Sequence, residues 1–312
     1  MNIAFAWNDA TRTRIKLFMA LSRTPHGLLD MATPAVGALL WLGGIPPLPV
    51  AVLGFITAFA GYTAVYALND VVDYRVDREK IKQCGLPDMG HDLDAICARH
   101  PLAQGLLSLQ EGIAWTCGWA LVALLGAYTL NPTCAWIFLG GCASEAIYCK
   151  MFRVSYLRTL VSGAVKTAGG LAAVFAVTPN PSFLFLLALF LWLFFWEIGG
   201  QNVPNDWADV SEDRDMEAIT VPVRFGPRAS ADIILGSLGI AVVLSLLLYW
   251  ITPAEIHSSY LLGALAAGLP LLIAPAMKLR RSLDKSDAAA LFNRASYYPP
   301  SMLLVIVISA WW

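Results

Sequence analysis

The sequence predicts an all-helical membrane protein whose chain crosses the bilayer nine times. Of its 312 residues, 58% are hydrophobic and 14% are charged, and the mean hydropathy is +0.62. Soluble globular chains carry about 25% charged residues, so this chain lacks the polar side chains to cover a water-facing surface. The composition therefore excludes a disordered segment, a nucleic-acid-binding protein and a secreted disulfide scaffold.

Nine apolar stretches are long enough to cross a bilayer, which takes about 20 mostly apolar residues. They are residues 26–43, 49–69, 110–129, 133–150, 159–178, 182–203, 231–252, 258–277 and 296–312. Prolines such as Pro46, Pro132 and Pro253 stand in the short connections, where a helix is expected to stop. The last stretch is the least regular, because Pro299 and Pro300 lie near its start.

Lysine and arginine are sorted to one side of the predicted bundle. If the nine stretches alternate in direction, 20 of the 21 basic residues precede the first stretch or fall in the second, fourth, sixth and eighth connections. Basic residues gather on the cytoplasmic side of membrane proteins, so we expect the N-terminus and these connections in the cytoplasm. The exception is Lys166, which lies within the fifth stretch.

The acidic residues are equally uneven, because 13 of the 22 lie in two segments, residues 69–94 and 206–217. Both regions carry the pattern N-D-x-x-D-x-x-x-D-R, which begins at Asn69 in one copy and at Asn205 in the other. At about 100° per helical residue, the amide and the carboxylates of each copy share one helix face. Each copy follows closely on an apolar stretch, on the predicted cytoplasmic side.

Such a face calls for positive charge, because carboxylates one helical turn apart repel each other. Carboxylate and amide oxygens suit Mg²⁺, which also binds phosphate oxygens. A single acidic helix end is usually only a solvated surface. Two matching copies on the same side of the membrane favour a metal site that holds a diphosphate.

These motifs resemble those of the UbiA superfamily of intramembrane prenyltransferases. The first family motif, NDxxDxxxD, is matched from Asn69 to Asp77, and the second, DxxxD, by Asp209 and Asp213. The stretch Arg99–Ser108 is similar to the family sequence R-P-L-x-x-G-x-x-S with one extra residue, and residues 220–226 match T-x-P-V-R-F-G.

The resemblance implies a UbiA-type bundle of nine transmembrane helices and a single domain over residues 1–312. Its active site would lie on the cytoplasmic side, formed by loops at about residues 69–108 and 202–230. The sequence departs from the family in three places: His100 is the extra residue, Phe152 stands where many members have Lys, and the connection over residues 78–98 is longer than expected. Long connections of this kind are often functional lids.

The resemblance also implies roles for individual residues. The Mg²⁺ ligands would be Asn69, Asp73, Asp77, Asp209 and Asp213, of which the four aspartates are the expected catalytic residues. The residues expected to orient these ligands are Asp70, Asn202, Asn205 and Asp206. The cations expected to bind the diphosphate are Arg99, Lys150 and Arg153.

The implied enzyme is a prenyltransferase, which transfers an alkyl group other than methyl from a polyprenyl diphosphate donor. We expect it to lie in a bacterial inner membrane and to use an aromatic acceptor of quinone biosynthesis, of the ubiquinone or menaquinone type. The alternatives are a glycerol phosphate, a phosphosugar or a tetrapyrrole acceptor. A terpene cyclase or a prenyl-diphosphate carrier on the same scaffold is a further alternative.

Ionisable groups inside the apolar stretches are candidates for work on the acceptor, since such groups are costly in a bilayer. The candidates for orienting the acceptor or removing its proton are Glu145, Lys166 and Glu197. An internal ion pair between the lysine and either acid explains them equally well.

Loss of diphosphate leaves an allylic cation that the apolar bundle would shelter from water. The aromatic faces of Tyr66, Tyr148 and Trp192 are candidates to stabilise it by cation–π attraction. In a chain with 11 tryptophans, ordinary packing is the alternative for any one of these rings.

Overall fold

The structure, a computed structural model, describes residues 13–85 and 98–310, and every regular element within them is a helix. Residues 13–21 are helical. The helices that follow are α2 (Thr24–Asp30), α3 (Ala32–Leu42), α4 (Leu48–Cys84), α5 (Leu109–Leu130), α6 (Pro132–Lys150), α7 (Arg158–Val177), α8 (Phe183–Trp196), the π-helix η2 (Glu197–Asn202), α9 (Val203–Ala208), α10 (Val210–Asp215), α11 (Val221–Ile251), α12 (Ser259–Gly268), the π-helix η3 (Leu269–Ile273), α13 (Ala274–Ser282), α14 (Lys285–Ser296) and α15 (Tyr298–Ala310). The all-helical prediction is therefore confirmed.

Six helical segments of the described chain are long and apolar enough to cross a membrane. They are Leu48–Cys84, Leu109–Leu130, Arg158–Val177, Phe183–Ala208, Val221–Ile251 and Ser259–Ser282. They match six of the nine predicted stretches. The other three stretches give shorter or more polar helices: α3 and α15 have 11 and 13 residues, because the helix restarts after Met31 and Tyr297, and α6 contains Glu145.

Helix α4 carries the first acidic motif because it does not stop at the end of its apolar part. It runs for 37 residues, with no proline or glycine between Gly61 and Gly85. It ends at Gly85, whose φ of 89° favours glycine. The expected helix face of Asn69, Asp73 and Asp77 is therefore present.

The second acidic motif does not form one continuous helix face, which corrects the expectation from its spacing. Helix α9 ends at Ala208, Asp209 has a non-helical backbone, and α10 begins at Val210. Aspartate is a favoured residue before a helix start. Here, however, its carboxylate binds Arg99 instead of capping α10.

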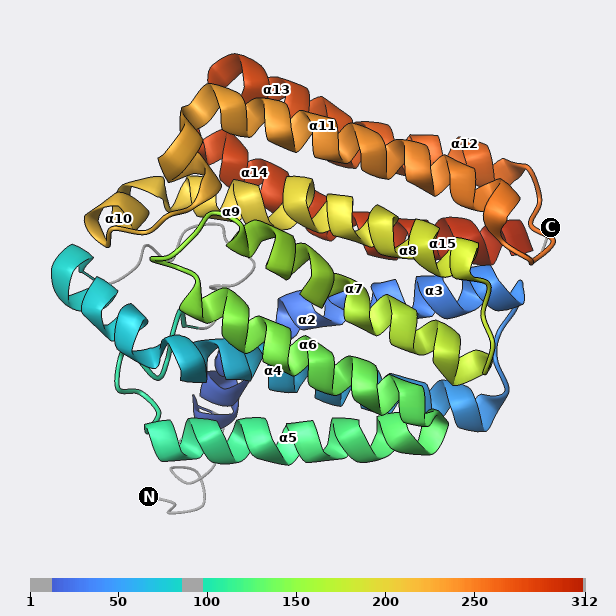
Figure 1. The fold of residues 1–312 in the computed structure, drawn as a ribbon, viewed down its shortest axis with the longest axis horizontal. Coiled ribbons are helices and arrows are strands. Elements are labelled where there is room, and N and C mark those ends of the chain that lie inside the picture. Colours follow the sequence, from blue (N-terminus) through green and yellow to red (C-terminus); the bar gives the residue numbers. More distant parts are fainter. Residues whose placement is uncertain (1–12, 86–97, 311–312) are drawn as a thin grey trace, which may run out of the picture.

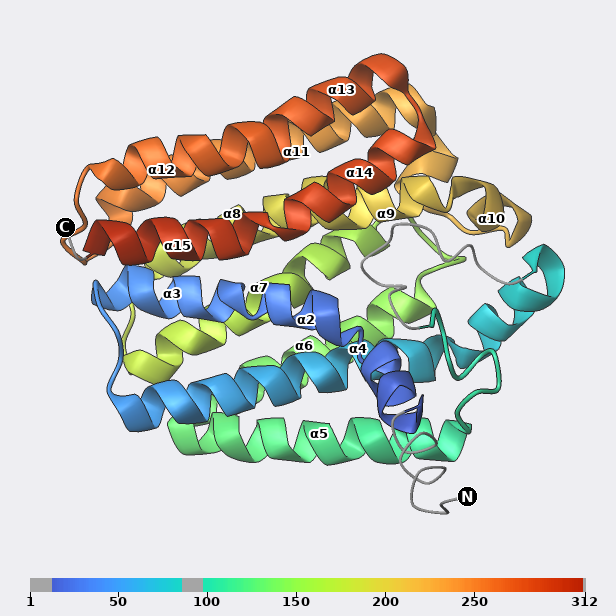
Figure 2. The same ribbon diagram turned by 180° about the vertical axis from the view of Figure 1, so that it is seen from behind.

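The helices divide into two groups, which Figures 1 and 2 show from opposite sides. Helix α5 lies along one edge with α4 beside it, and α11, α12 and α13 lie along the opposite edge. Helix α10 and the C-terminal end of α4 lie at the same end of the bundle, so the two acidic motifs face one another.

The group formed by α8 and α11–α15 is a packed apolar core. Trp192, Trp196, Tyr260 and Tyr298 are fully buried in it, and Trp192 Nε1 donates a hydrogen bond to Tyr298 Oη at 3.2 Å. The ring of Trp192 therefore packs in the core, and the alternative of ordinary packing holds for this residue.

Helices α3 and α7 approach closely where two glycines meet. A Cβ atom on Gly37 would lie 2.6 Å from the backbone oxygen of Gly170, and a Cβ on Gly170 would lie 2.6 Å from Leu193 Cδ1. Glycine is required here because any side chain would push the two helices apart. Small residues of this kind allow close helix packing in membranes.

We expect Gly37→Ala to lower the melting temperature of the purified protein, because overpacking a tight contact costs about 1–3 kcal/mol. The matched control is Gly236→Ala on α11, where an added Cβ meets nothing within 4 Å. The control should melt at or slightly above the wild-type temperature. Equal melting temperatures for both variants would contradict the close approach of α3 and α7.

Candidate active site

The bundle encloses a cavity of about 800 Å³ that is polar at one end and apolar at the other. Acidic residues of α4 and of the α9–α10 segment line the polar end. Small and aromatic residues such as Ala123, Phe138 and Ala172 line the apolar part. Of the fifteen residues expected to bind or orient the metal, the diphosphate or the acceptor, thirteen line this cavity; the exceptions are Lys150 and Arg153.

Asn69 holds the first motif in place through three neighbours. Its Oδ1 accepts a hydrogen bond from Arg23 Nη2 at 3.1 Å. Its Nδ2 donates to Glu145 Oε1 at 2.7 Å and lies 3.3 Å from Cys149 Sγ. Glu145 therefore supports the motif itself.

His100 lies between two carboxylates of the first motif. Its Nδ1 is 3.4 Å from Asp70 Oδ1 and 3.1 Å from Asp77 Oδ2, and these three side chains form a group of metal-ligand geometry. Burial opposes the charged form of His100, but the two carboxylates outweigh it and raise its pKa to about 9. The imidazolium thus neutralises Asp70 and Asp77.

Cations also hold the second motif. Asp209 forms an ion pair with Arg99, and Lys80 Nζ lies 3.7 Å from Asp209 Oδ2, 2.9 Å from Glu212 Oε2 and 3.9 Å from Asp213 Oδ1. Burial raises the pKa of Asp209, but Arg99 and Lys80 bring it below its usual value. Burial and then Asp206 raise the pKa of Asp213 to about 7. Lys80, from α4, links the two motifs.

The donor set at the polar end fits Mg²⁺. It consists of carboxylate oxygens and the side-chain amides of Asn69, Asn202 and Asn205. Carboxylates gathered this closely repel one another, and the chain's own cations offset that repulsion. Oxygen donors with nearby cations suit an Mg²⁺ ion that carries a phosphorylated ligand.

Arg158 is a cavity residue that the sequence analysis missed. Its side chain is 6% exposed, and its Cζ lies 4.1 Å from the ring centroid of Tyr148 and 5.0 Å from that of Phe152. Its Nε and Nη1 have no hydrogen-bond partner among the described residues. Phe152 could have indicated this residue from the sequence. It stands where many family members have Lys, so another basic residue of the chain is expected to replace that charge.

Two predicted diphosphate ligands lie outside the cavity lining. Lys150 is exposed at the end of α6. Arg153 donates from Nε to Met216 O at 2.8 Å, and its Nη2 lies 3.1 Å from Glu79 Oε2. Arg153 therefore ties the α6–α7 connection to α4 and to the segment after α10.

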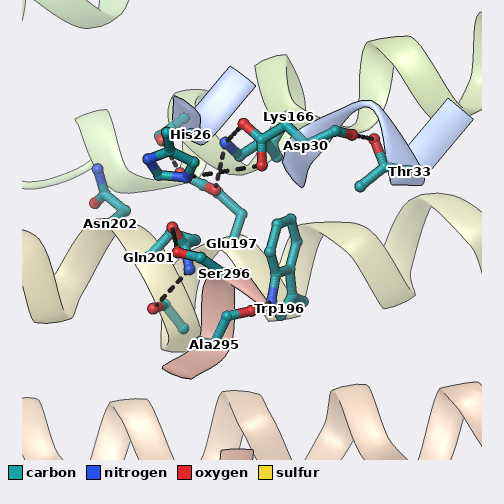
Figure 3. Close-up of polar contacts among 12 residues, drawn as sticks. His26, Asp30, Thr33, Lys166, Trp196, Glu197, Gln201, Asn202, Ala295 and Ser296 are labelled. Atoms are coloured by element: carbon teal, nitrogen blue, oxygen red, sulfur yellow. Dashed lines mark hydrogen bonds and ion pairs between the residues drawn. The ribbon is translucent and has the colours of Figure 1, made fainter. Parts of the chain in front are cut away.

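A buried ion cluster lies deeper in the cavity (Figure 3). Lys166 of α7 donates to Asp30 Oδ2 at 2.6 Å and to Tyr66 Oη at 3.2 Å, and its Nζ lies 3.7 Å from Glu197 Oε2. Tyr66 also donates to Asp30, and His26 Nε2 lies 3.7 Å from Asp30 Oδ1. Lys166 is thus paired with acids, including the predicted Glu197.

Residues 31–297 match the UbiA prenyltransferase family, and the chain belongs to that family. It is therefore a prenyltransferase and a multi-pass integral membrane protein. The fold agrees, because the structure resembles a UbiA homologue from Aeropyrum pernix K1 with a TM-score of 0.69, 18% identity and coverage of 91% of this chain and 97% of the other. A UbiA homologue from Archaeoglobus fulgidus bound to DMAPP and Mg²⁺ gives a TM-score of 0.63 at 18% identity, over 93% and 99% of the chains.

The names of three relatives do not refer to the quinone-pathway acceptor that the sequence predicts. A protoheme IX farnesyltransferase of Nitrosomonas eutropha is 29% identical over 62% of each chain, and that of Photobacterium profundum is 22% identical over 94% of this chain and 88% of its own length. A digeranylgeranylglyceryl phosphate synthase of Pyrococcus horikoshii is 25% identical over 86% of both. None of these three names is that of a quinone-pathway enzyme.

We expect His100→Asn to lower the melting temperature in EDTA, because Asp70 and Asp77 lose their shared cation. Asparagine tolerates the left-handed backbone of this position, where φ is 53°. In chains of 150–250 residues, each 1 kcal/mol lost from the free energy of unfolding lowers the melting temperature by roughly 2–4 °C.

Added Mg²⁺ should restore the His100→Asn variant by more degrees than it raises the wild type, since the ion replaces the lost charge. His257→Asn, at an exposed histidine that contacts Ser259, is the control and should respond like the wild type. A variant that Mg²⁺ does not stabilise would show that these carboxylates do not bind the ion.

Proposed function

We propose that this protein transfers a polyprenyl group from its diphosphate, in the presence of Mg²⁺, to a non-aromatic or tetrapyrrole acceptor. The observation that carries the proposal is the meeting of two acidic motifs at the polar end of an otherwise apolar cavity. Archaeoglobus homologues of the same fold bind DMAPP or GPP together with Mg²⁺, which supports it. The named relatives support the choice of acceptor class.

In this proposal the metal ligands are Asn69, Asp73, Asp77, Asp209 and Asp213. Four neighbours orient them: Asp70, Asn202, Asn205 and Asp206. Asn202 Nδ2 donates to Tyr148 Oη at 3.0 Å, which fixes its amide, and Asp70 holds His100 and Arg23. When bound, Mg²⁺ supplies positive charge that neutralises the leaving diphosphate.

The diphosphate is bound by Arg99, Arg158 and Lys80. All three line the cavity, whereas Lys150 and Arg153 do not. Nε and Nη1 of Arg158 have no hydrogen-bond partner in the described structure, so each can donate a charge-assisted hydrogen bond to a phosphate oxygen. This residue supplies the charge that Phe152 lacks.

The apolar part of the cavity holds the prenyl chain and excludes water from the reacting carbon. Tyr66 and Tyr148 line the cavity next to the motifs, and their rings stabilise positive charge on the allylic group. Each ring also lies near a protein cation, Lys166 and Arg158 respectively.

We further propose that one domain over residues 1–312 crosses a bacterial inner membrane nine times. The N-terminus and the two motif loops then lie on the cytoplasmic side. The sorting of 20 of 21 basic residues to that side supports this topology. The stretches that contain α2 with α3, α6, and α15 complete the nine crossings together with the six long segments.

Removal of Mg²⁺ with EDTA should abolish prenyl transfer by the purified protein. Asp73→Ala and Asp209→Ala should each lower kcat/KM at least about 100-fold, equal to roughly 2.7 kcal/mol of transition-state stabilisation. They should also lose the rise in melting temperature that Mg²⁺ with geranyl diphosphate gives the wild type. The control Asp232→Ala removes an exposed carboxylate outside the cavity and should behave like the wild type. Full activity in EDTA would refute the proposal.

Arg158→Gln should raise KM for the prenyl diphosphate by about 10-fold or more, because a hydrogen bond to a charged group contributes roughly 1.5–3 kcal/mol. Lys150→Gln makes the same change of charge at an exposed position and should leave KM unchanged. Arg158→Lys keeps the charge but loses the planar guanidinium, so its KM should lie between those of the wild type and Arg158→Gln. A larger effect at Lys150 than at Arg158 would contradict the assignment.

A further inference from the structure

The cluster around Lys166 leaves one hydrogen-bond donor unused. An ammonium group has three N–H donors. In the described structure Lys166 makes two hydrogen bonds, to Asp30 Oδ2 and to Tyr66 Oη. Its distance of 3.7 Å to Glu197 Oε2 is too long for a third. One N–H of a buried cation that lines the cavity is therefore available to a ligand.

Glu197 leaves the complementary acceptor unused. Its Oε1 accepts a hydrogen bond from Ser162 Oγ at 2.8 Å, whereas its Oε2 has no hydrogen-bond partner in the part of the chain that the structure describes. The residue is 6% exposed and also lines the cavity. A buried carboxylate oxygen without a partner is costly, so a bound donor group would stabilise it.

A hydroxyl group fits this gap, because it accepts one hydrogen bond and donates another. Its oxygen can accept from Lys166 Nζ while its O–H donates to Glu197 Oε2. A carboxylate or a phosphate does not fit, since it has no proton to donate and would face the negative charges of Glu197 and Asp30. Figure 3 shows Asp30, Lys166 and Glu197 converging from three helices.

The cluster lies at the depth where the reacting carbon would be. Tyr66 precedes Asn69 by three residues on α4, and Glu197 precedes Asn202 by five residues on η2. One helical turn rises about 5.4 Å, so on α4 the cluster lies about one turn below Asn69 and about two turns below Asp73. A donor with its diphosphate at those motifs and its chain in the apolar part brings its C1 atom close to the cluster.

We infer that Lys166, Glu197 and Asp30 form the binding site for the acceptor, and that the acceptor reacts through an uncharged alcohol hydroxyl. This inference rests on the proposed function and narrows its acceptor class. Glu197 is the catalytic base, Lys166 holds the acceptor oxygen, and Asp30 positions Lys166.

The reaction at this site balances in one substitution. The acceptor oxygen attacks C1 of the prenyl group and forms a C–O bond, while the bond from C1 to the diphosphate oxygen breaks and its electron pair leaves with the diphosphate. The hydroxyl proton passes to Glu197 Oε2. The products are a prenyl ether and diphosphate, and no oxidant or reductant is needed.

The test uses the full-length purified protein with Mg²⁺ and geranylgeranyl diphosphate. Transfer is measured to geranylgeranylglyceryl phosphate, which offers an alcohol, to its O-methyl ether, which does not, and to 4-hydroxybenzoate and protohaem. Binding of geranylgeranyl S-thiolodiphosphate, an unreactive donor analogue, is measured separately and reports on the acidic motifs alone. We expect an ether product from the alcohol and none from its methyl ether.

Glu197→Gln should lower kcat with the alcohol at least about 100-fold, within the range for a general base. Its Kd for the donor analogue should stay within about twofold of the wild-type value, which shows that the variant is folded. The double variant Lys166→Met with Asp30→Asn removes the ion pair without changing the net charge of the cluster and should raise KM for the alcohol about tenfold or more, as loss of a charged hydrogen bond predicts. Asp232→Asn is the matched surface control.

Three results would overturn the inference while leaving the proposed function intact. They are transfer by the wild type to protohaem but not to the alcohol, wild-type kcat in Glu197→Gln, and equal transfer to the alcohol and its methyl ether. Transfer to 4-hydroxybenzoate alone would instead refute the acceptor class of the proposed function, and the inference with it. By contrast, a wild-type protein that fails to bind the donor analogue with Mg²⁺ refutes the proposed function itself, and the inference with it.

Discussion

The rest of the site depends on the repulsion among carboxylates gathered at the polar end of the cavity. Asp70, Asp73 and Asp77 project from α4, and Asp206, Asp209 and Asp213 face them from α9 and α10. Such a group stays folded only when positive charge offsets the repulsion. The chain provides that charge through His100, Arg99 and Lys80, and in the proposed function the same requirement favours binding of Mg²⁺ and of a substrate that the ion accompanies.

The apolar walls of the cavity strengthen the electrostatic interactions of these charged side chains. Electrostatic interactions are stronger where water is excluded, and the walls of the cavity below the motifs are mainly aliphatic and aromatic. The wider turn of η2 brings Glu197 and Gln201 into this region between α8 and α9. π-helical turns are often found at functional sites. Polar chemistry is thus placed at two depths, with the acidic motifs above and the Lys166 cluster below.

Two features of this chain distinguish its site within the family pattern. The extra residue before Pro101 is His100, which neutralises Asp70 and Asp77 and explains why an insertion in that motif is tolerated. The loss of a lysine at Phe152 is offset by Arg158, whose guanidinium lies against the Phe152 ring. His100 therefore adds a positive charge to the cavity, and Arg158 places one beside Phe152.

The sequence by itself determined the helical membrane fold, the two acidic motifs and most of the acidic and amide residues that line the cavity. Composition and helical spacing are local properties, and a charged residue beside an apolar stretch can be recognised without knowing its neighbours. Only the tertiary structure decided which cations serve the site. Arg158 rather than Lys150 enters the cavity, Asp209 breaks its helix to bind Arg99, and Asp30 meets Lys166 across 136 residues of sequence. These pairings depend on which helices pack together, and the spacing of residues along the chain does not specify that packing.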